Sequence, residues 1–189
     1  MVERLGRLGY RVCRLLHPQI AALIACRSKE GRANVMTAAW AMPVSADPPM
    51  VAVSISPKRY SHKLISETGE FTVNIPGVEL LDAVFYCGTV SGRDVDKFEE
   101  AGLTPVRGEV VDAPVIAECA ASLECRVVES VDAGDHTLFI GEVVAVHVKE
   151  GVFEEVYSED FEPLLHLGGD LFCTTGKRFR AERKKRTRS

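Results

Sequence analysis

A strand that alternates between apolar and small polar residues constrains the fold of this chain more than any other feature. Its apolar side chains share one face and are Val51, Val53 and Ile55. The residues that alternate with them are Ala52, Ser54 and Ser56, and they share the opposite face because successive side chains on a strand alternate. One face is therefore suited to a hydrophobic core. A ligand can lie close to the other face, which is small and polar.

A helix is expected to begin directly after this strand, and its first turn is a candidate anion site. Ser61 is a good N-cap residue, and Gly69 is the expected end of the helix. Leu64 and Ile65 are its first apolar positions. The free N–H groups and the positive dipole end of a helix start favour a phosphate group. Arg59 lies just before this start and can add a charge-assisted ion pair.

Length and composition indicate one globular domain over residues 1–175. The chain has 189 residues, of which 46% are hydrophobic and 26% are charged, as in ordinary globular proteins. No apolar run approaches the roughly 18 residues that a membrane helix needs, and the charged N-terminus does not resemble a secretory signal. We therefore expect a cytoplasmic protein.

The six cysteines are expected to be reduced thiols that bind no metal. They form no C-x-x-C pair and have no metal-ligand spacing with the histidines. Cys119 and Cys125 are expected on one strand, about 20 Å apart, which is too far to share a disulfide or a metal. Unpaired cysteines agree with a reducing compartment.

A basic C-terminal tail is expected over residues 176–189. It carries eight Lys or Arg residues against one acid, Glu182, so its net charge is +7 and the rest of the chain carries −11. We expect a disordered, solubilising tail. The alternative is a contact with nucleic acid or another anionic surface, although no nucleic-acid fold motif accompanies the charge.

The hydrophobic patterns predict a mainly β protein with inserted helices. Strands are expected at 19–26, 33–41, 50–56, 70–75, 117–129 and 137–148, with a turn at 132–135 that joins the last two in a hairpin. Amphipathic or short helices are expected at 3–17, 61–67 and 78–86, followed by a break at Cys87–Gly88 and a helix from Ser91 to Gly102 with Ser91 and Asp94 as a capping box. Mostly short links favour an antiparallel barrel over a doubly wound parallel sheet.

Common catalytic motifs are missing from the sequence. It contains no G-x-S-x-G, no H-E-x-x-H and no G-x-G-x-x-G, and its five histidines are scattered. The remaining candidate is a bound redox cofactor, for which the protein supplies orientation and electrostatics.

Five motifs together give the chain a family resemblance. They are NVMTAAW at 34–40, S-x-S-P-x-R-Y-S-H-x-L-I at 54–65, GEFTVNIP at 69–76, SGRDVDKFEEAGL at 91–103 and GDHTLFIGEV at 134–143. In this order they resemble the flavin reductase-like proteins with an FMN-binding split β-barrel, over roughly Pro18 to Val148. The resemblance implies a mainly β fold with flanking helices, of the antiparallel Greek-key split-barrel type.

The resemblance also implies which residues form the site. The flavin ring is expected against Asn34, Met36, Thr37, Ala38 and Trp40, with Thr37 and Ala38 near its N5 and pyrimidine edge. The ribityl chain and phosphate are expected against Ser54, Ser56, Arg59, Ser61 and His62. Lesser contacts are expected from Asn74, Cys87, Ser91 and Lys97. His136, at a hairpin end, is the expected catalytic residue, facing the open side of the flavin as a substrate-binding or proton-handling group.

The function implied by the resemblance is an FMN-binding oxidoreductase. NADH or NADPH is the expected hydride donor, and free flavin, ferric iron, oxygen or a protein is the acceptor. The alternative is a flavoredoxin-type electron carrier that a partner protein reduces. An oxidase of the pyridoxamine type is an analogy at the level of fold only. A homodimer is expected, with flavin at the interface and with the N-terminal helix and residues 78–100 as interface pieces.

Overall fold

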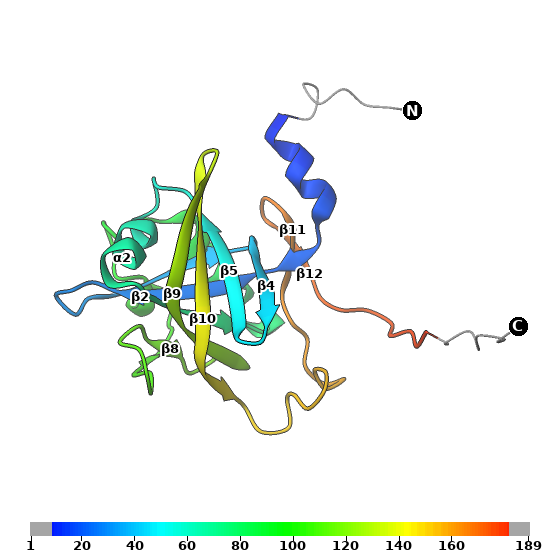
Figure 1. Cartoon of the computed structure of the whole chain (residues 1–189). Helices are drawn as coiled ribbons and strands as arrows, with labels where there is room; N and C mark the ends of the chain where they lie inside the picture. Colours follow the sequence, from blue (N-terminus) through cyan, green and yellow to red (C-terminus); the bar gives the residue numbers. More distant parts are fainter. Residues whose placement is uncertain (1–8, 182–189) are drawn as a thin grey trace, which may run out of the picture.

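A computed structural model describes residues 9–181 as an antiparallel, mainly β structure with helices around it (Figure 1). The strands are β1 (Gln19–Ile20), β2 (Ala22–Arg27), β3 (Ala33–Ala38), β4 (Ala41–Ala46), β5 (Pro49–Ile55), β6 (Glu70–Ile75), β7 (Pro105–Val106), β8 (Val115–Ile116), β9 (Ala121–Ala133), β10 (His136–Val148), β11 (Leu165–Gly168) and β12 (Leu171–Cys173). The helices are η1 (Gly9–Leu16), α2 (Tyr60–Thr68), η2 (Val78–Leu80), α3 (Leu81–Thr89) and α4 (Lys97–Glu100), of which η1 and η2 are 3-10 helices.

The main sheet has seven strands in the order β3-β2-β6-β9-β10-β5-β4. Its two edge strands, β3 and β4, are consecutive in the chain and are separated only by Ala39 and Trp40. The sheet therefore does not close, and its two edges come together where the chain crosses from one to the other. This arrangement confirms the predicted antiparallel fold class. Two smaller sheets, β1-β11-β12 and β7-β8, lie outside the main one.

The long β9–β10 hairpin agrees with the prediction at its turn and differs at its start. The turn lies at Gly134, whose positive φ of 66° favours glycine, and the two strands pair from His136 with Ala133 to Val148 with Ala121. The first strand begins at Ala121, so the predicted start at residue 117 is wrong. Cys119 consequently lies before the strand and not on it.

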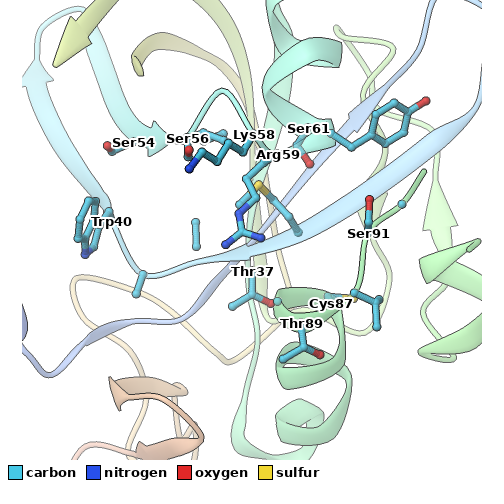
Figure 2. A pocket seen from close by; sticks show the side chains of 18 of the residues that line it. Thr37, Trp40, Ser54, Ser56, Lys58, Arg59, Ser61, Cys87, Thr89 and Ser91 are labelled. Atoms are coloured by element: carbon cyan, nitrogen blue, oxygen red, sulfur yellow. The ribbon is translucent and has the colours of Figure 1, made fainter. Parts of the chain in front are cut away.

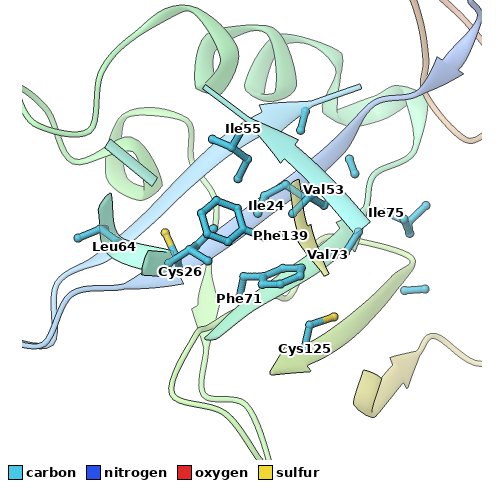
Figure 3. Close-up of a cluster of buried hydrophobic side chains, with 14 residues drawn as sticks. Ile24, Cys26, Val53, Ile55, Leu64, Phe71, Val73, Ile75, Cys125 and Phe139 are labelled. Atoms are coloured by element: carbon cyan, nitrogen blue, oxygen red, sulfur yellow. The ribbon is translucent and has the colours of Figure 1, made fainter. Parts of the chain in front are cut away.

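Strand β2 has apolar residues on both faces because both faces are buried. Ile24 and Cys26 point into the barrel core, with Phe71 and Phe139 among their companions (Figure 3). Leu23 and its neighbours on the opposite face pack against the second core beneath α3 and α4. A sheet that is covered on both sides has strands that are apolar without alternation, which explains the continuous apolar run at 19–26.

Two of the predicted strands are each broken into two. The run at 19–26 divides at Ala21, because β1 pairs with β11 in the small sheet while β2 pairs with β3 and β6. The run at 33–41 divides at Ala39 and Trp40, where the chain leaves one edge of the main sheet and enters the other. Hydrophobic periodicity indicates extended chain and does not indicate which sheet that chain joins.

Several boundaries of the helices differ from the prediction. Arg59, and not Ser61, occupies the N-cap of α2, with no side-chain capping bond. Helix α3 runs through the predicted break at Cys87–Gly88 to Thr89. The predicted cap at Ser91 is also wrong, since Asp96 caps α4 through hydrogen bonds from the N–H groups of Phe98 and Glu99. The predicted ends at Gly69 and Gly102 are confirmed, with φ of 70° and 64°.

A buried carboxylate holds the loop before β8 onto the barrel. The side chain of Glu124 on β9 is fully buried, and it accepts hydrogen bonds from the N–H groups of Glu109, Val110 and Val111 at 2.7, 2.8 and 2.9 Å. His147 donates a further bond from Nε2 at 2.5 Å, so this histidine has a structural role. Burial alone raises the pKa of Glu124, but these hydrogen bonds outweigh it and lower the pKa to about 2.

Both described ends of the chain extend away from the barrel (Figure 1). The predicted helix at 3–17 is a 3-10 helix over Gly9–Leu16, and residues 3–8 lie outside the described part. Leu15 and Leu16 are each 73% exposed, so they do not pack on the barrel. Residues 182–189 of the basic tail also lie outside the described part. No helix within 9–181 has the length and apolar character required to cross a membrane.

Candidate functional site

A cavity of about 430 Å³ lies where β3, the end of β5, the start of α2 and residues 87–93 meet (Figure 2). Its volume is within the range of small-molecule and cofactor sites. Most of the predicted site residues line it, namely Asn34, Met36, Thr37, Ala38, Trp40, Ser54, Ser56, Arg59, Ser61, Cys87, Ser91, Lys97 and His136. Strand alternation thus correctly placed Ser54 of β5, and Ser56 just after it, on one common side, which faces the cavity.

One end of the cavity has the features of a phosphate cradle. Arg59 lies at the N-cap of the nine-residue helix α2, whose first N–H groups are free of helical partners. Lys58 and Arg93 line the same end, and the Arg93 guanidinium lies 5.2 Å from the centre of the Tyr60 ring. Helix dipole and three cations together favour a group with more than one negative charge.

Asn34 carries a buried oxygen that has no partner among the described residues. Its side chain is 3% exposed, and its Nδ2 donates to Ser61 Oγ at 2.7 Å, which fixes the amide and leaves Oδ1 without a hydrogen bond. A Cβ on Gly92 would lie only 1.8 Å from this oxygen. Glycine is therefore needed beside Asn34. A buried unsatisfied acceptor at a cavity wall indicates that a ligand donor completes the site.

The wall opposite the strand is formed by α3 and by Lys97. Lys97 is 5% exposed, and its Nζ donates to the Cys87 carbonyl at 2.7 Å. Burial lowers the pKa of Lys97, and burial also raises the pKa of the Cys87 thiol to about 11. The Cys87 thiol is therefore neutral and inert at ordinary pH. The Thr37 hydroxyl donates to the Val84 carbonyl and ties β3 to α3.

Trp40 and His136 form an aromatic part of the cavity at the crossing between β3 and β4. Their ring centroids lie 4.9 Å apart, and Trp40 is 40% exposed. His136 Nδ1 lies 2.7 Å from Asp135 Oδ1, and because a carboxylate accepts, this nitrogen is the donor. The Asp135 contact therefore holds the His136 ring beside Trp40, where both line the cavity.

Two predicted ligand residues do not line the cavity. His62 donates from Nε2 to Thr137 Oγ1 at 2.9 Å and packs edge-on against Phe139, and burial lowers its pKa. Asn74 is fully buried on the other side of the sheet from the barrel core. Its amide bonds Leu23 and Thr72, and its oxygen accepts from Ile116 and Ser122. Both residues stabilise the barrel, so the geometry gives no support to the prediction that they contact the ligand.

Sequence reasoning missed several lining residues. Lys58 and Arg93 lie inside motifs that were recognised and could have been found as cations flanking the phosphate cradle. No signal in the sequence indicated three other lining residues, Arg14, His17 and His166. His17 and His166 are 149 positions apart, and the small sheet brings them together. No group of three or more His, Cys, Asp or Glu residues within 9–181 is placed to hold a metal.

Comparison with known proteins gives a match over most of the chain. The model of the flavin reductase like domain family matches residues 14–174. A relative from Archaeoglobus fulgidus is 50% identical over 118 residues, which are 62% of this chain and 66% of that protein. The chain therefore spans just under two thirds of the length of this relative, and it spans 59% of a second one from Aeropyrum pernix.

Solved structures resemble the whole described fold. The flavoredoxin of Desulfovibrio vulgaris (Miyazaki F) is 31% identical with a TM-score of 0.83, and the match covers 100% of both chains. An FMN-binding protein from Thermus thermophilus, solved with bound 1-cyclohex-2-enone, is 32% identical with a TM-score of 0.81. That match covers 88% of this chain and 92% of the other.

Proposed function

The chain belongs to the flavin reductase like domain family, and on that premise we propose that it is an oxidoreductase that binds FMN and transfers electrons from NADH or NADPH to an acceptor. The observation that carries this proposal is the cavity itself. It combines a cationic helix start at one end with a buried, unpartnered Asn34 oxygen in its wall and an aromatic mouth. These features fit, in that order, a phosphate, a hydrogen-bond donor and a flat ring.

Each part of the cavity has a role in holding FMN under this proposal. Arg59 and the first N–H groups of α2 bind the phosphate, with Ser56 and Ser91 as hydroxyl donors nearby. The backbone of residues 36–39 would lie along the ring, where the small side chains of Thr37, Ala38 and Ala39 permit close approach. Bound FMN supplies the hydride and electron chemistry. His136, whose Nδ1 is held by Asp135, would accept or return a proton through Nε2 at the open end of the cavity.

Anaerobic reduction tests the proposal directly. Purified protein loaded with FMN is mixed with NADH and, separately, with NADPH, and the visible absorption band of the flavin is followed. Bleaching by either nucleotide at a rate that depends on protein concentration supports the reductase. FMN binding is measured first, by titration of the protein with FMN. A protein that does not bind FMN refutes the cofactor assignment.

A flavoredoxin-type electron carrier is the second candidate. Similarity to the D. vulgaris flavoredoxin over the whole of both chains favours it. Such a carrier holds FMN tightly and receives electrons from a protein partner. Tight FMN binding without bleaching by either nucleotide would support the carrier over the reductase.

We also propose a cytoplasmic homodimer. All six cysteines are free thiols, which suits a reducing compartment. The exposed Leu15 and Leu16 on the projecting η1 helix suit burial against a second copy. Sedimentation of the wild type and of a Leu15→Ser, Leu16→Ser double variant measures this, and a wild type that remains monomeric at high concentration contradicts it.

A further inference from the structure

A buried lysine in the cavity wall has no acidic partner. Lys97 is 5% exposed, and no Asp or Glu within residues 9–181 forms an ion pair with it. The acids of its own helix do not supply one, because Asp96 caps α4 through the N–H groups of Phe98 and Glu99, and Glu99 and Glu100 are exposed. A buried charge is costly unless it is paired. The Lys97 charge therefore lacks a counter-ion in the described part of the chain.

The Lys97 ammonium group also has hydrogen-bond donors that the described residues do not use. Its Nζ donates to the Cys87 carbonyl at 2.7 Å, which is a neutral partner. A lysine ammonium group has three donors, so one bond leaves the others without a protein acceptor within residues 9–181. Lys97 lines the cavity. A molecule in the cavity can therefore supply both the missing acceptor and the missing negative charge.

Lys97 lies beside the phosphate cradle. Arg59, at the N-cap of α2, is close enough for its charge to disfavour the charged form of Lys97. Cys26 also interacts with Lys97, and its sulfur lies 3.8 Å from the amide nitrogen of Asn34. The same nitrogen donates to Ser61 Oγ at 2.7 Å, in the first turn of α2. An anion that Arg59 and the start of α2 hold is thus placed to be the counter-ion of Lys97.

The titratable groups that face Lys97 come from three other elements. They are Cys87 of α3, Arg59 before α2 and Cys26 of β2. Burial raises the pKa of both thiols to about 11, and arginine stays charged at any ordinary pH. Burial is the largest cause of the lowered pKa of Lys97, and the Arg59 charge adds to it. Between pH 7 and 9.5, Lys97 is therefore the member of this group that can change its charge.

We propose that the phosphate of bound FMN is the counter-ion of Lys97, so that binding of FMN is coupled to the uptake of a proton from solvent by this lysine. The inference rests on the proposed function, in which FMN is the cofactor. A phosphate monoester carries nearly its full charge above pH 7, because its second pKa is about 6. Riboflavin has the same ring and ribityl chain but no phosphate, so it gives Lys97 no counter-ion.

The sign of the pH dependence follows from this coupling. A ligand that raises the pKa of Lys97 binds the protonated form of the protein more tightly. The affinity for FMN is therefore complete below the pKa of Lys97 in the empty protein. It falls as the pH rises above that value, until the lysine of the complex also loses its proton. The affinity for riboflavin does not depend on pH in this way, so the preference for the phosphorylated flavin shrinks as the solution becomes alkaline.

Binding of FMN and of riboflavin at pH 7, 8.5 and 9.5 tests the proposal. Calorimetry in buffers of different ionisation enthalpy also gives the number of protons taken up with each flavin. The variant is Lys97→Met, which keeps a long side chain without its charge. Lys58→Met is the matched control, since Lys58 lines the same cavity but is exposed. Urea unfolding of each empty protein checks that it is folded, and an apolar side chain in place of an uncompensated buried charge should not lower stability.

The expected result for the wild type is an FMN affinity that falls about threefold or more from pH 7 to pH 9.5, with uptake of part of a proton at pH 8.5. Riboflavin shows neither effect. Lys58→Met binds FMN more weakly than the wild type but keeps the same fall with pH. Lys97→Met loses both the fall with pH and the uptake of a proton.

Three results would overturn the proposal. They are a wild-type affinity for FMN that stays constant with pH, an equal fall for riboflavin, and a Lys97→Met protein that keeps the fall. The comparison of FMN with riboflavin uses the wild type alone, so it decides the question even if Lys97→Met does not fold. A folded wild type that binds no FMN at pH 7 refutes the proposed function and this inference together, whereas FMN binding without the pH dependence refutes this inference alone.

Discussion

Replacing Glu124 by glutamine should cost the protein about 3 kcal/mol of its free energy of unfolding at neutral pH. The side chain is fully buried, and its carboxylate accepts three backbone N–H groups and His147. These bonds lower the pKa from 4.5 to about 2. A shift of this size corresponds to about 3 kcal/mol, because each pKa unit is about 1.4 kcal/mol. Glutamine has the same shape but carries no charge, and it brings two donors to a site that is made of donors.

The sign of the pH dependence follows from the lowered pKa. The contribution of Glu124 is complete above pH 4.5, where the unfolded carboxyl is also ionised, and it is lost as the pH falls towards 2. At pH 3 the advantage of the wild type over Glu124→Gln should have fallen to roughly half of its value at pH 7. At pH 2 most of it should be gone.

Urea unfolding of both proteins at pH 7, 4.5 and 3 measures this difference. Glu129→Gln is the matched control because Glu129 is exposed on the same strand, and its effect should stay within about 0.5 kcal/mol. Two results would refute the reasoning. One is a Glu124→Gln protein that is as stable as the wild type at pH 7. The other is a stability difference that stays the same from pH 7 to pH 3.

Three further predictions concern the cavity and the thiols. Arg59→Ala should lower FMN affinity by about 1.5 to 3 kcal/mol, and Arg59→Lys by less, as measured by flavin fluorescence; unchanged affinity in Arg59→Ala removes it from the phosphate site. Gly92→Ala should lower the free energy of unfolding by about 1 to 3 kcal/mol, since its Cβ meets the Asn34 oxygen, and an unshifted urea midpoint would contradict that contact. Only Cys13 and Cys173 should react quickly with Ellman's reagent in the native protein, because burial raises the pKa of the other four thiols to about 11 or 12; four fast thiols would disprove this.

The sequence predicted correctly those features of the fold that depend on the conformational preferences of a few consecutive residues. Alternation of side chains along the strand correctly predicted that Ser54 and Ser56 face one side, which is the cavity, and that Val53 and Ile55 lie in the core. Gly69 was correctly placed at a helix end, because few other residues adopt its positive φ. These features depend on a few consecutive residues, so the sequence carries them directly.

Features that depend on distant packing could not be predicted in this way. Ser61 has the side chain of a good cap, but the partner that it finds is Asn34, 27 positions earlier, which draws it into the cavity wall. The family resemblance implied that Asn74, on a polar strand face, contacts the ligand. That face instead lies against β8, where it completes a buried hydrogen-bond network with Ile116 and Ser122. Polarity alone does not distinguish a ligand from a protein partner.

The unclosed main sheet determines what kind of change the cavity can tolerate. Edge strand β3 pairs with β2 on one side only, so the backbone groups on its other side are left for whatever lies in the cavity. Backbone amides are the same for every residue except proline. Substitutions at Met36, Ala38 and Ala39 should therefore alter the fit of an occupant without removing its hydrogen bonds, whereas a single proline in this strand would take one away. The open edge of the main sheet is therefore the part of the cavity wall at which side chains can change while the backbone hydrogen-bonding groups stay in place.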